Sequence, residues 1–260
     1  MDVATLVGWG LAIAAVVTSV ILEGGDPMAM FALPPLILVF IGTFGVAMAG
    51  GALKDTISSI QVGIKALTGG VKPADGTVAD IVKLAEKARR EGLLALEDAA
   101  KGIDDPFLKK GVQFAVDGTD PEEVRDILEA EIEAKKAVSK TASKFFTDMG
   151  AYAPTIGIIG TVNGLIHVLE NLDKPETLGH SIAIAFIATL WGVMSANVFW
   201  LPLGKRITRL AELEAANAEL VVEGVNAIQS GINPRVVQQK LAAHLPPGAA
   251  DAAKGAKKAA

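Results

Sequence analysis

Long apolar stretches without a formal charge alternate with polar segments along the 260-residue chain. An α-helix needs roughly 20 predominantly apolar residues to cross the hydrocarbon core of a bilayer. Four stretches meet this condition: 3–22, 27–53, 149–169 and 177–204. The pattern therefore predicts four transmembrane helices, arranged as two hairpins with a long polar segment between them.

The polar segments follow a helical period, and none of them alternates as a strand would. After the second span, Ile57, Ile60 and Ile64 share one face, which predicts an amphipathic helix on the membrane surface or against the protein's own spans. Asp120-Pro121 predicts the start of a helix that continues directly into the third span. The fold class expected is an all-α integral membrane protein with a helical cytoplasmic domain between spans two and three.

These patterns divide the chain into five predicted segments. They are a transmembrane hairpin at 1–53, the cytoplasmic helical domain at 54–147, a second hairpin at 148–204, amphipathic cytoplasmic helices at 205–245 and a disordered tail at 246–260.

Composition and charge give the predicted orientation. Apolar residues make up 51% of the chain and charged residues 20%. Of the 24 Lys and Arg residues, 15 lie in 54–147 and 8 follow Gly204, while the two short loops contain only Lys174. Cytoplasmic loops carry the excess of Lys and Arg, so the polar segment and both termini are predicted to be cytoplasmic.

Several kinds of chemistry are not expected. The chain has no cysteine, so disulfides and thiolate catalysis are excluded. Its three histidines show no metal-ligand spacing, and no basic stripe indicates nucleic-acid binding. The helical domain is too small and too closely tied to the membrane for an independent enzyme. We therefore expect no catalytic residues, no bound metal and no cofactor.

Polar residues inside the last two predicted spans are few and regularly placed. Small residues and threonines form one face on each span, and small faces allow helices in lipid to pack closely. The faces consist of Pro154, Gly157, Thr161 and Gly164 on span three, and of Ala185, Thr189, Gly192 and Ala196 on span four. Two interpretations stay open: Gly157, Gly164 and Gly192 mark helix packing, and Thr161 and Thr189 either share that role or line an ion pathway.

An acidic group is absent from all four predicted spans, which contain no Asp, Glu, Lys or Arg in their interior. A protein that moves ions across a membrane usually needs an intramembrane carboxylate as relay or counter-charge. If ions cross beside these hydroxyls, a second chain must supply the carboxylate, and this chain is half of a channel.

Five motifs together resemble one family. They are ARREGLLALED (88–98), DDPFLKKGVQFAVDG, APTIGIIGTVNGLI, IAFIATLWGVMSANVFWLPLGKR and EGVNAIQSGINPRVVQQKL. Over essentially its whole length the chain resembles the A subunit of the bacterial flagellar motor stator, the MotA/PomA family, whose members also have two hairpins split by a cytoplasmic helical domain.

The resemblance implies the following partners and roles. A homo-oligomeric ring of A subunits, pentameric in the family, surrounds a dimer of B subunits (MotB/PomB) in the bacterial inner membrane, and each B chain brings the missing aspartate. Cation flow turns the ring, which pushes on the rotor protein FliG and serves motility and chemotaxis. The motif positions that match the family's rotor contacts are Arg89, Arg90, Glu97 and Asp98, and those that match its hinges are Pro154 and Pro202.

The transported cation is Na⁺ or H⁺. Thr161 lies where sodium-type members resemble this chain and many proton-type members have alanine, which favours sodium. Ala188 stands where sodium-type members typically have a second threonine, which favours the proton. Sodium is slightly favoured. Two alternative functions stay open: a TolQ/ExbB-type energy-transducing proton channel subunit, and a membrane scaffold or transporter. The fourth charge-free stretch argues against a TolQ/ExbB-type subunit, because those relatives usually have three spans.

Overall fold

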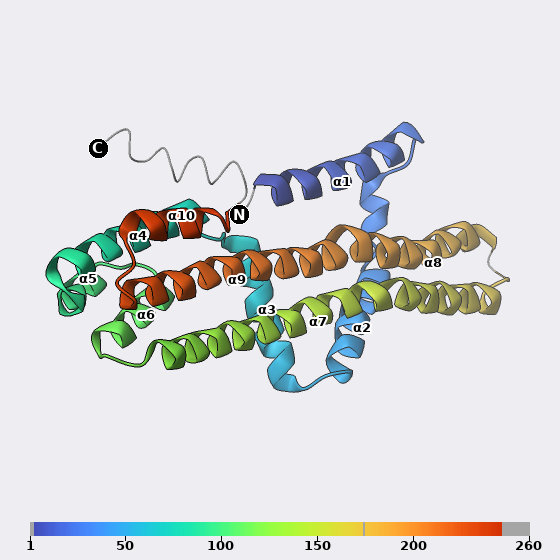
Figure 1. Ribbon diagram of the computed structural model, residues 1–260. Helices are drawn as coiled ribbons and strands as arrows, with labels where there is room; N and C mark the ends of the chain where they lie inside the picture. Colours follow the sequence, from blue (N-terminus) through green and yellow to red (C-terminus); the bar gives the residue numbers. More distant parts are fainter. Residues whose placement is uncertain (1–2, 174, 246–260) are drawn as a thin grey trace. The chain divides into compact units, whose positions relative to one another are not determined.

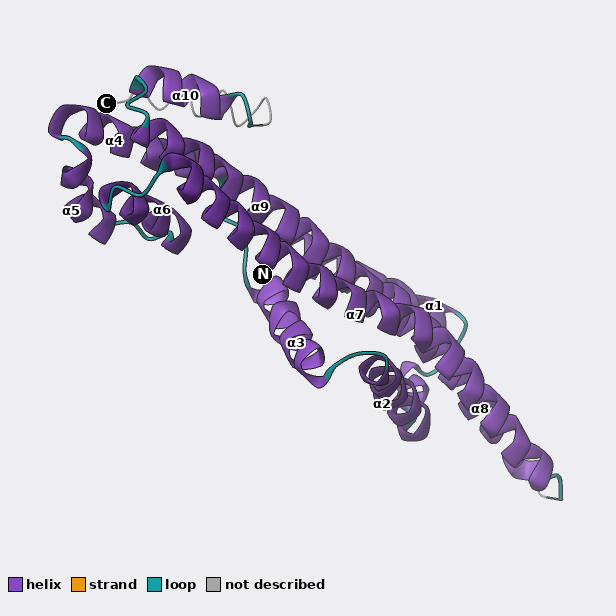
Figure 2. Cartoon of the chain, turned by 60° about the horizontal axis from the view of Figure 1, so that its bottom comes forward, coloured by secondary structure: helices purple, strands orange, loops and turns teal. Residues whose placement is uncertain are grey.

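The computed structural model describes residues 3–173 and 175–245, and these residues form helices and short connections without a strand (Figures 1 and 2). The all-α prediction is therefore confirmed for these ranges; the tail predicted at 246–260 lies outside them. In chain order the elements are α1 (Val3–Leu22), η1 (Pro27–Phe31), α2 (Leu33–Ala49), α3 (Leu53–Thr68), α4 (Ala74–Glu91), η2 (Leu93–Ala95), α5 (Leu96–Lys101), α6 (Pro106–Val116), α7 (Pro121–Glu170), α8 (Pro175–Ser195), η3 (Ala196–Trp200), α9 (Leu201–Gln229) and α10 (Pro234–Ala242).

The helices form two compact units. The first unit comprises Met1–Gly70 and Val138–Arg209, and the second comprises Val71–Ala137 and Leu210–Ala260. One boundary falls between α3 and α4, and the other two fall inside α7 and α9, so each of these two helices contributes residues to both units. The predicted segment boundaries at 53, 147 and 204 describe topology across a membrane and stay a prediction.

Within the part of the chain that the structure describes, three helices are long and apolar enough to cross a membrane, namely α1 and the helices that contain 121–170 and 175–229. The apolar helix α2 is shorter, with 17 residues. The prediction of one helix over 27–53 was wrong, because 27–31 form a separate 3₁₀ turn and Ala32 is extended. Pro34 and Pro35 lie in the first turn of α2, where a missing N–H leaves no helical bond unmade. The fourth span stays a prediction.

The helix that begins at Asp120-Pro121 is confirmed and continues without a break to Glu170. The last apolar helix is also continuous with α9, through the π-helical turn η3. Pro202 follows this turn and has no N–H to donate to the Val198 carbonyl. The Leu201 N–H instead donates to the Ala196 carbonyl five residues back. Pro202 therefore lies inside a helix and does not end one.

Aromatic side chains hold α2 against the later helices of the first unit. Phe40 contacts both Trp191 and Trp200, with ring centroids 5.7 and 6.0 Å apart. The indole N–H of Trp191 donates to the Met30 carbonyl at 2.6 Å, which ties η1 to α8. Helix α1 makes an edge contact through Trp9 with Phe199 and leaves most of its apolar side chains exposed.

Helix α3 does not pack with the face that its periodicity indicates. Its buried residues are the small ones, including Ser59 and Gly63, while Ile57, Ile60 and Ile64 are exposed. A Cβ on Gly63 would lie 2.7 Å from the Phe146 ring, so only glycine permits this approach. The alternative in which the isoleucines pack on the protein's own spans was wrong.

The second unit encloses an apolar core. Helices α4 and α10 pack together, and α6 and the first part of α7 complete the core with α9. Ile81, Leu128 and Val225 are among its fully buried members. Gly111 and Gly224 lie where a Cβ would come within 2.8 Å of the Val225 and Ile81 side chains, so the helices approach closely at both positions.

Candidate functional site: a hydroxyl pair between two apolar helices

The small faces of α7 and α8 lie directly against each other in the first unit. A Cβ on Gly157 would lie 2.8 Å from the Ala188 carbonyl oxygen and 3.2 Å from the Cα of Gly192. A Cβ on Gly192 would lie 2.7 Å from the Ala153 carbonyl oxygen. The structure thus brings together two of the three predicted packing glycines at backbone distance, which leaves no room for a side chain.

The third glycine, Gly164, makes a similar approach one turn beyond Thr161. Its Cβ would lie 2.6 Å from the Cβ of Ala185 and 3.0 Å from the Cα of the same residue. Gly160, on the neighbouring side of α7, is equally close to the Cβ of Ala188. The two helices are therefore in backbone contact above and below Thr161.

Thr161 and Thr189 meet inside this contact. Their hydroxyl groups are hydrogen-bonded to each other, and either can be the donor. The Thr161 hydroxyl is also 3.0 Å from the Ala185 carbonyl oxygen and 3.2 Å from that of Gly157. The Thr189 hydroxyl is 3.4 Å from the same Gly157 carbonyl. Four oxygens, two from side chains and two from the backbone, thus converge between α7 and α8.

The four converging oxygens can have two roles, helix packing and cation coordination. The hydroxyls can hold the helices together, because each finds a partner within the hairpin and none is left unpaired in an apolar setting. They can also exchange these bonds for a cation, since hydroxyl and carbonyl oxygens replace water around a dehydrated ion. No Asp, Glu, Lys or Arg lies between Asp148 and Glu170 or between Glu176 and Lys205, so the charge that balances a cation has to come from outside these two span interiors.

The two proline positions lie on either side of this contact along the chain. Pro154 is inside α7, one turn before Gly157, and leaves the Gly150 carbonyl without a donor four residues on. Pro202 follows the π-helical turn. On the outer side of both prolines along the chain, Ser143 of α7 donates to the Gly204 carbonyl at 2.9 Å, and its hydroxyl also lies 2.8 Å from that of Thr208. The hinge role of both prolines stays a prediction.

The motif ARREGLLALED spans the end of α4, the turn η2 and the start of α5 in the second unit, and helices α4 and α5 are labelled in Figure 1. Arg89 and Arg90 end α4, and Glu97 and Asp98 begin α5, and all four are exposed. Gly92 makes the turn with φ +85°, a conformation that favours glycine.

Only some of these charged side chains form ion pairs within the chain. The Arg90 guanidinium lies 4.0 Å from Glu86, and Asp98 accepts from Lys101 at 2.8 Å. That bond holds the pKa of Asp98 below its usual value and raises that of Lys101. Arg89 and Glu97 make no hydrogen bond or ion pair with the residues that the structure describes. Glu91, the last residue of α4, is likewise exposed and has no such bond, so one basic and two acidic side chains of this motif are free for a partner.

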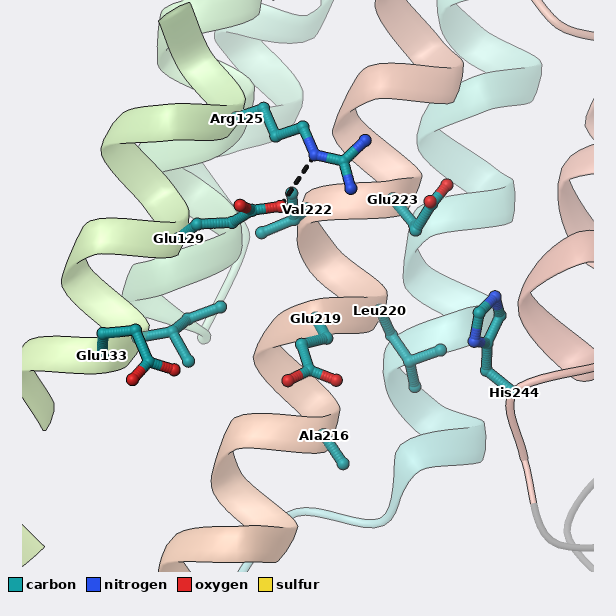
Figure 3. Close-up of a pocket in the computed structure, with 10 residues that line it drawn as sticks. Arg125, Glu129, Glu133, Ala216, Glu219, Leu220, Val222, Glu223 and His244 are labelled. Atoms are coloured by element: carbon teal, nitrogen blue, oxygen red, sulfur yellow. Dashed lines mark hydrogen bonds and ion pairs between the residues drawn. The ribbon is translucent and has the colours of Figure 1, made fainter. Parts of the chain in front are cut away.

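A polar hollow of about 420 Å³ in the second unit was not found from the sequence (Figure 3). It lies between α7 and α9, with His244 at one edge. Arg125 and Glu129 of α7 form an ion pair at 2.7 Å across its rim, and Glu219 and Glu223 of α9 face it. Residues about 100 positions apart meet here only through tertiary packing. No group of three or more His, Asp or Glu side chains among the described residues is arranged to hold a metal ion.

Glu223 also fixes α10 to α9, and its removal tests this link. Lys240 donates to Glu223 at 2.5 Å and holds the pKa of that carboxyl below its usual value. A carboxyl with a lowered pKa stabilises the fold above its unfolded pKa, and that contribution is lost as the pH falls through the folded pKa. We expect Glu223→Gln to lower the free energy of unfolding by about 0.2–1 kcal/mol at pH 7, since the pair is partly exposed.

The measurement is denaturant unfolding of the purified full chain at neutral pH and below about pH 4, near the ordinary carboxyl pKa. The difference between wild type and variant shrinks at the lower pH. Glu219→Gln is the matched control, because Glu219 makes no hydrogen bond to the described residues. Equal effects of the two variants at pH 7 would contradict a specific role for the Glu223–Lys240 pair.

Comparisons with known proteins agree over nearly the whole chain. Residues 99–220 match the model of the MotA/TolQ/ExbB proton channel family. Motility protein A of Bacillus subtilis is 35% identical over 95% of this chain and 92% of its own length, and chemotaxis protein PomA of Vibrio alginolyticus is 32% identical over 95% and 97%. The solved C. jejuni MotAB has a TM-score of 0.90 at 30% identity, covering 95% of this chain and 97% of that chain. The flagellar MotAB stator complex from Bacillus subtilis has a TM-score of 0.85 at 33% identity, with the same coverage.

Proposed function

Because this chain belongs to the MotA/PomA family of flagellar motor stator subunits, we propose that it is the A subunit of an ion-driven stator, which couples cation flow to torque on the flagellar rotor. The observation that carries the proposal is the α7–α8 contact: converging hydroxyl and carbonyl oxygens between two apolar spans whose interiors contain no acid. The proposal assigns the missing acid to a B subunit.

A B-subunit partner fits the chemistry of the hairpin. An ion beside Thr161 and Thr189 needs a counter-charge, because a lone cation in the hydrocarbon region is costly. Two structurally similar relatives were solved as MotAB complexes, which supports a MotB- or PomB-type partner here. We propose that several copies of the chain, five as in the family, form a ring around a B-subunit dimer whose intramembrane aspartates supply the carboxylate.

Sodium is the favoured cation, and the proton is the alternative. The four oxygens at Thr161, Thr189, Gly157 and Ala185 are the kind of hard ligands that replace the water of Na⁺. A proton needs a carboxylate and water more than it needs such a set. Ala188 in place of a second threonine reduces the number of hydroxyls and keeps the proton alternative open.

Torque is proposed to pass through the charged turn between α4 and α5 to the rotor protein FliG. Arg89, Glu91 and Glu97 offer unpaired charges of both signs, while Arg90 and Asp98 have partners within the chain. Exposed ion pairs contribute about 0.2–1 kcal/mol each and are screened by salt, which suits contacts that are made and broken repeatedly. Motility, and chemotaxis that depends on it, would follow from this contact.

The proposed location is the inner membrane of a bacterium, with several spans and both termini in the cytoplasm. The three long apolar helices support a membrane location. The excess of Lys and Arg in 54–147 and after Gly204 supports the cytoplasmic side for the polar segments. The second unit, which carries the charged turn, would then lie on the side where a cytoplasmic rotor is reached.

The test is expression with and without a B subunit in cells that lack their own stator. We expect swimming and cation flux only when both chains are present, since the acid and the oxygens then meet. Full cation flux through the purified chain alone would contradict the proposal, as would failure of every B-type partner to restore swimming. Replacement of the B-subunit aspartate by asparagine is the control, because it should remove flux while the complex still assembles.

A TolQ/ExbB-type proton channel subunit is the second candidate, favoured by the match of residues 99–220 to a family that includes both. Matches to motility proteins over 95% of the chain favour the stator. The same cells separate the two: a TolQ/ExbB-type subunit would leave them without swimming under any B subunit. A non-conducting scaffold would give neither swimming nor flux.

A further inference from the structure

The charged turn between α4 and α5 also contains an exposed leucine. Leu94 is 76% exposed, more than any other large apolar side chain among the described residues of the second unit. It belongs to η2, between the arginines that end α4 and the acids that begin α5. Scattered exposed apolar residues are common on protein surfaces, so its position relative to these charges is what gives it weight.

The backbone of the turn holds Leu94 outward. In a 3₁₀ turn, residues three apart lie on the same side. Leu93 and Leu96 lie on the core side, where Leu96 is fully buried and Leu93 packs against the core. Leu94 lies a third of a turn away and is exposed, as is Glu97 in the first turn of α5. Gly92, with φ +85°, fixes where the turn begins, so the exposure of Leu94 follows from a structured corner.

We propose that Leu94 is the apolar anchor of the rotor contact, which inserts into an apolar hole on a rotor segment that carries both acidic and basic side chains. This inference rests on the proposed function. Charge complementarity identifies the occupant: Arg89 calls for an acid, and Glu91 and Glu97, on either side of Leu94 along the chain, call for bases. Apolar centres surrounded by polar side chains are the usual anatomy of a protein interface.

The anchor gives the contact a property that charges alone do not have. Ion pairs at an exposed corner weaken as salt rises, because the Debye length shortens. Burial of a leucine is not weakened by salt in this way, since it depends on apolar area removed from water. The two contributions can therefore be separated by measuring affinity at two salt concentrations.

The experiment compares Leu94→Ser with the wild type, as the complete complex with its B subunit, in binding to the purified rotor protein at about 0.1 and 0.5 M NaCl. We expect the variant to bind about tenfold more weakly at both concentrations, the effect of losing one buried leucine. Leu94→Met should restore most of the binding. Val236→Ser, an exposed apolar position of α10, is the matched control and should stay within about twofold.

Three outcomes would overturn the inference. If Leu94→Ser binds as the wild type at both salt concentrations and supports equal swimming, Leu94 is not an anchor, and the proposed function stands. If the variant changes the oligomer mass but not rotor binding, a second copy of the chain covers Leu94 instead. If the wild-type complex neither binds the rotor protein nor restores swimming, the proposed function itself fails, and the inference with it.

Discussion

Gly157→Leu should stop swimming, because it separates α7 from α8 at the hydroxyl pair. The nearest atoms to a Cβ at this position belong to the backbone: the Ala188 carbonyl oxygen at 2.8 Å, the Cα of Thr189 at 3.1 Å and the Cα of Gly192 at 3.2 Å. Backbone cannot rotate away as a flexible side chain can, so the helices must move apart. Overpacking of this kind costs about 1–3 kcal/mol or more, and the displacement breaks the bond between Thr161 and Thr189.

The measurement is the swimming speed of cells that carry the variant with its B subunit, together with the thermal midpoint of the purified chain. Both should fall. Gly179→Leu is the matched control, since Gly179 lies near the start of α8 with nothing within 4 Å of its Cβ position. Normal swimming by Gly157→Leu would show that the backbone contact is not required for function.

Thr161→Val should reduce sodium-driven swimming at least about tenfold while leaving the chain folded. Valine keeps the branched shape and removes the hydroxyl, which takes one of the four converging oxygens from the site. The stability cost is small, about 0.5–1.5 kcal/mol for the lost hydrogen bonds, because the Thr189 hydroxyl can still donate to the Gly157 carbonyl. A large loss of function with a small loss of stability would assign the hydroxyl to the ion pathway.

Swimming speed as a function of external sodium is the readout, and Thr161→Ser should keep most of the wild-type dependence. Thr155→Val is the control on the same helix, since that hydroxyl donates only to the Tyr152 carbonyl at 2.7 Å. If Thr161→Val swims with the wild-type sodium dependence, the hydroxyl serves packing alone. Wild-type swimming that follows the proton gradient and ignores sodium would favour the proton alternative.

The helical architecture was predictable from the sequence because the apolar periodicity of α4, α6 and α9 is helical and Gly or Pro residues occur at several of the connections between elements. Asp120-Pro121 also identified the start of α7, since a capping carboxylate followed by a first-turn proline is a local signal. Continuous apolar composition could not show where α2 begins. The two prolines at 34 and 35 confine its first turn, and 27–31 form a separate turn as a result.

Which helix faces pack together was harder to predict from the sequence. The periodicity of α3 identified its apolar face, yet the face that packs against the rest of the first unit is the one with Ser59 and Gly63, because close approach to Phe146 requires small residues. Spacing placed Thr161 and Thr189 on small faces, but the carbonyl oxygens of Gly157 and Ala185 that join them belong to the backbone and leave no mark in the sequence. In the LLAL run, only the 3₁₀ geometry of η2 distinguishes exposed Leu94 from buried Leu96.

The π-helical turn at η3 amounts to one residue inserted into an otherwise regular α-helical ladder. Deleting a single residue there, such as exposed Asn197, would restore the ordinary ladder and keep the later residues near their present angular setting, because the π turn fits one extra residue into one turn. Gly204 would still face Ser143, and the Arg206 Nε would keep the Ala66 carbonyl that it now reaches at 2.7 Å. One residue can thus be lost from this turn without misdirecting the helix beyond it, whereas one residue removed from an unbroken α-helical stretch rotates everything after it by about 100°.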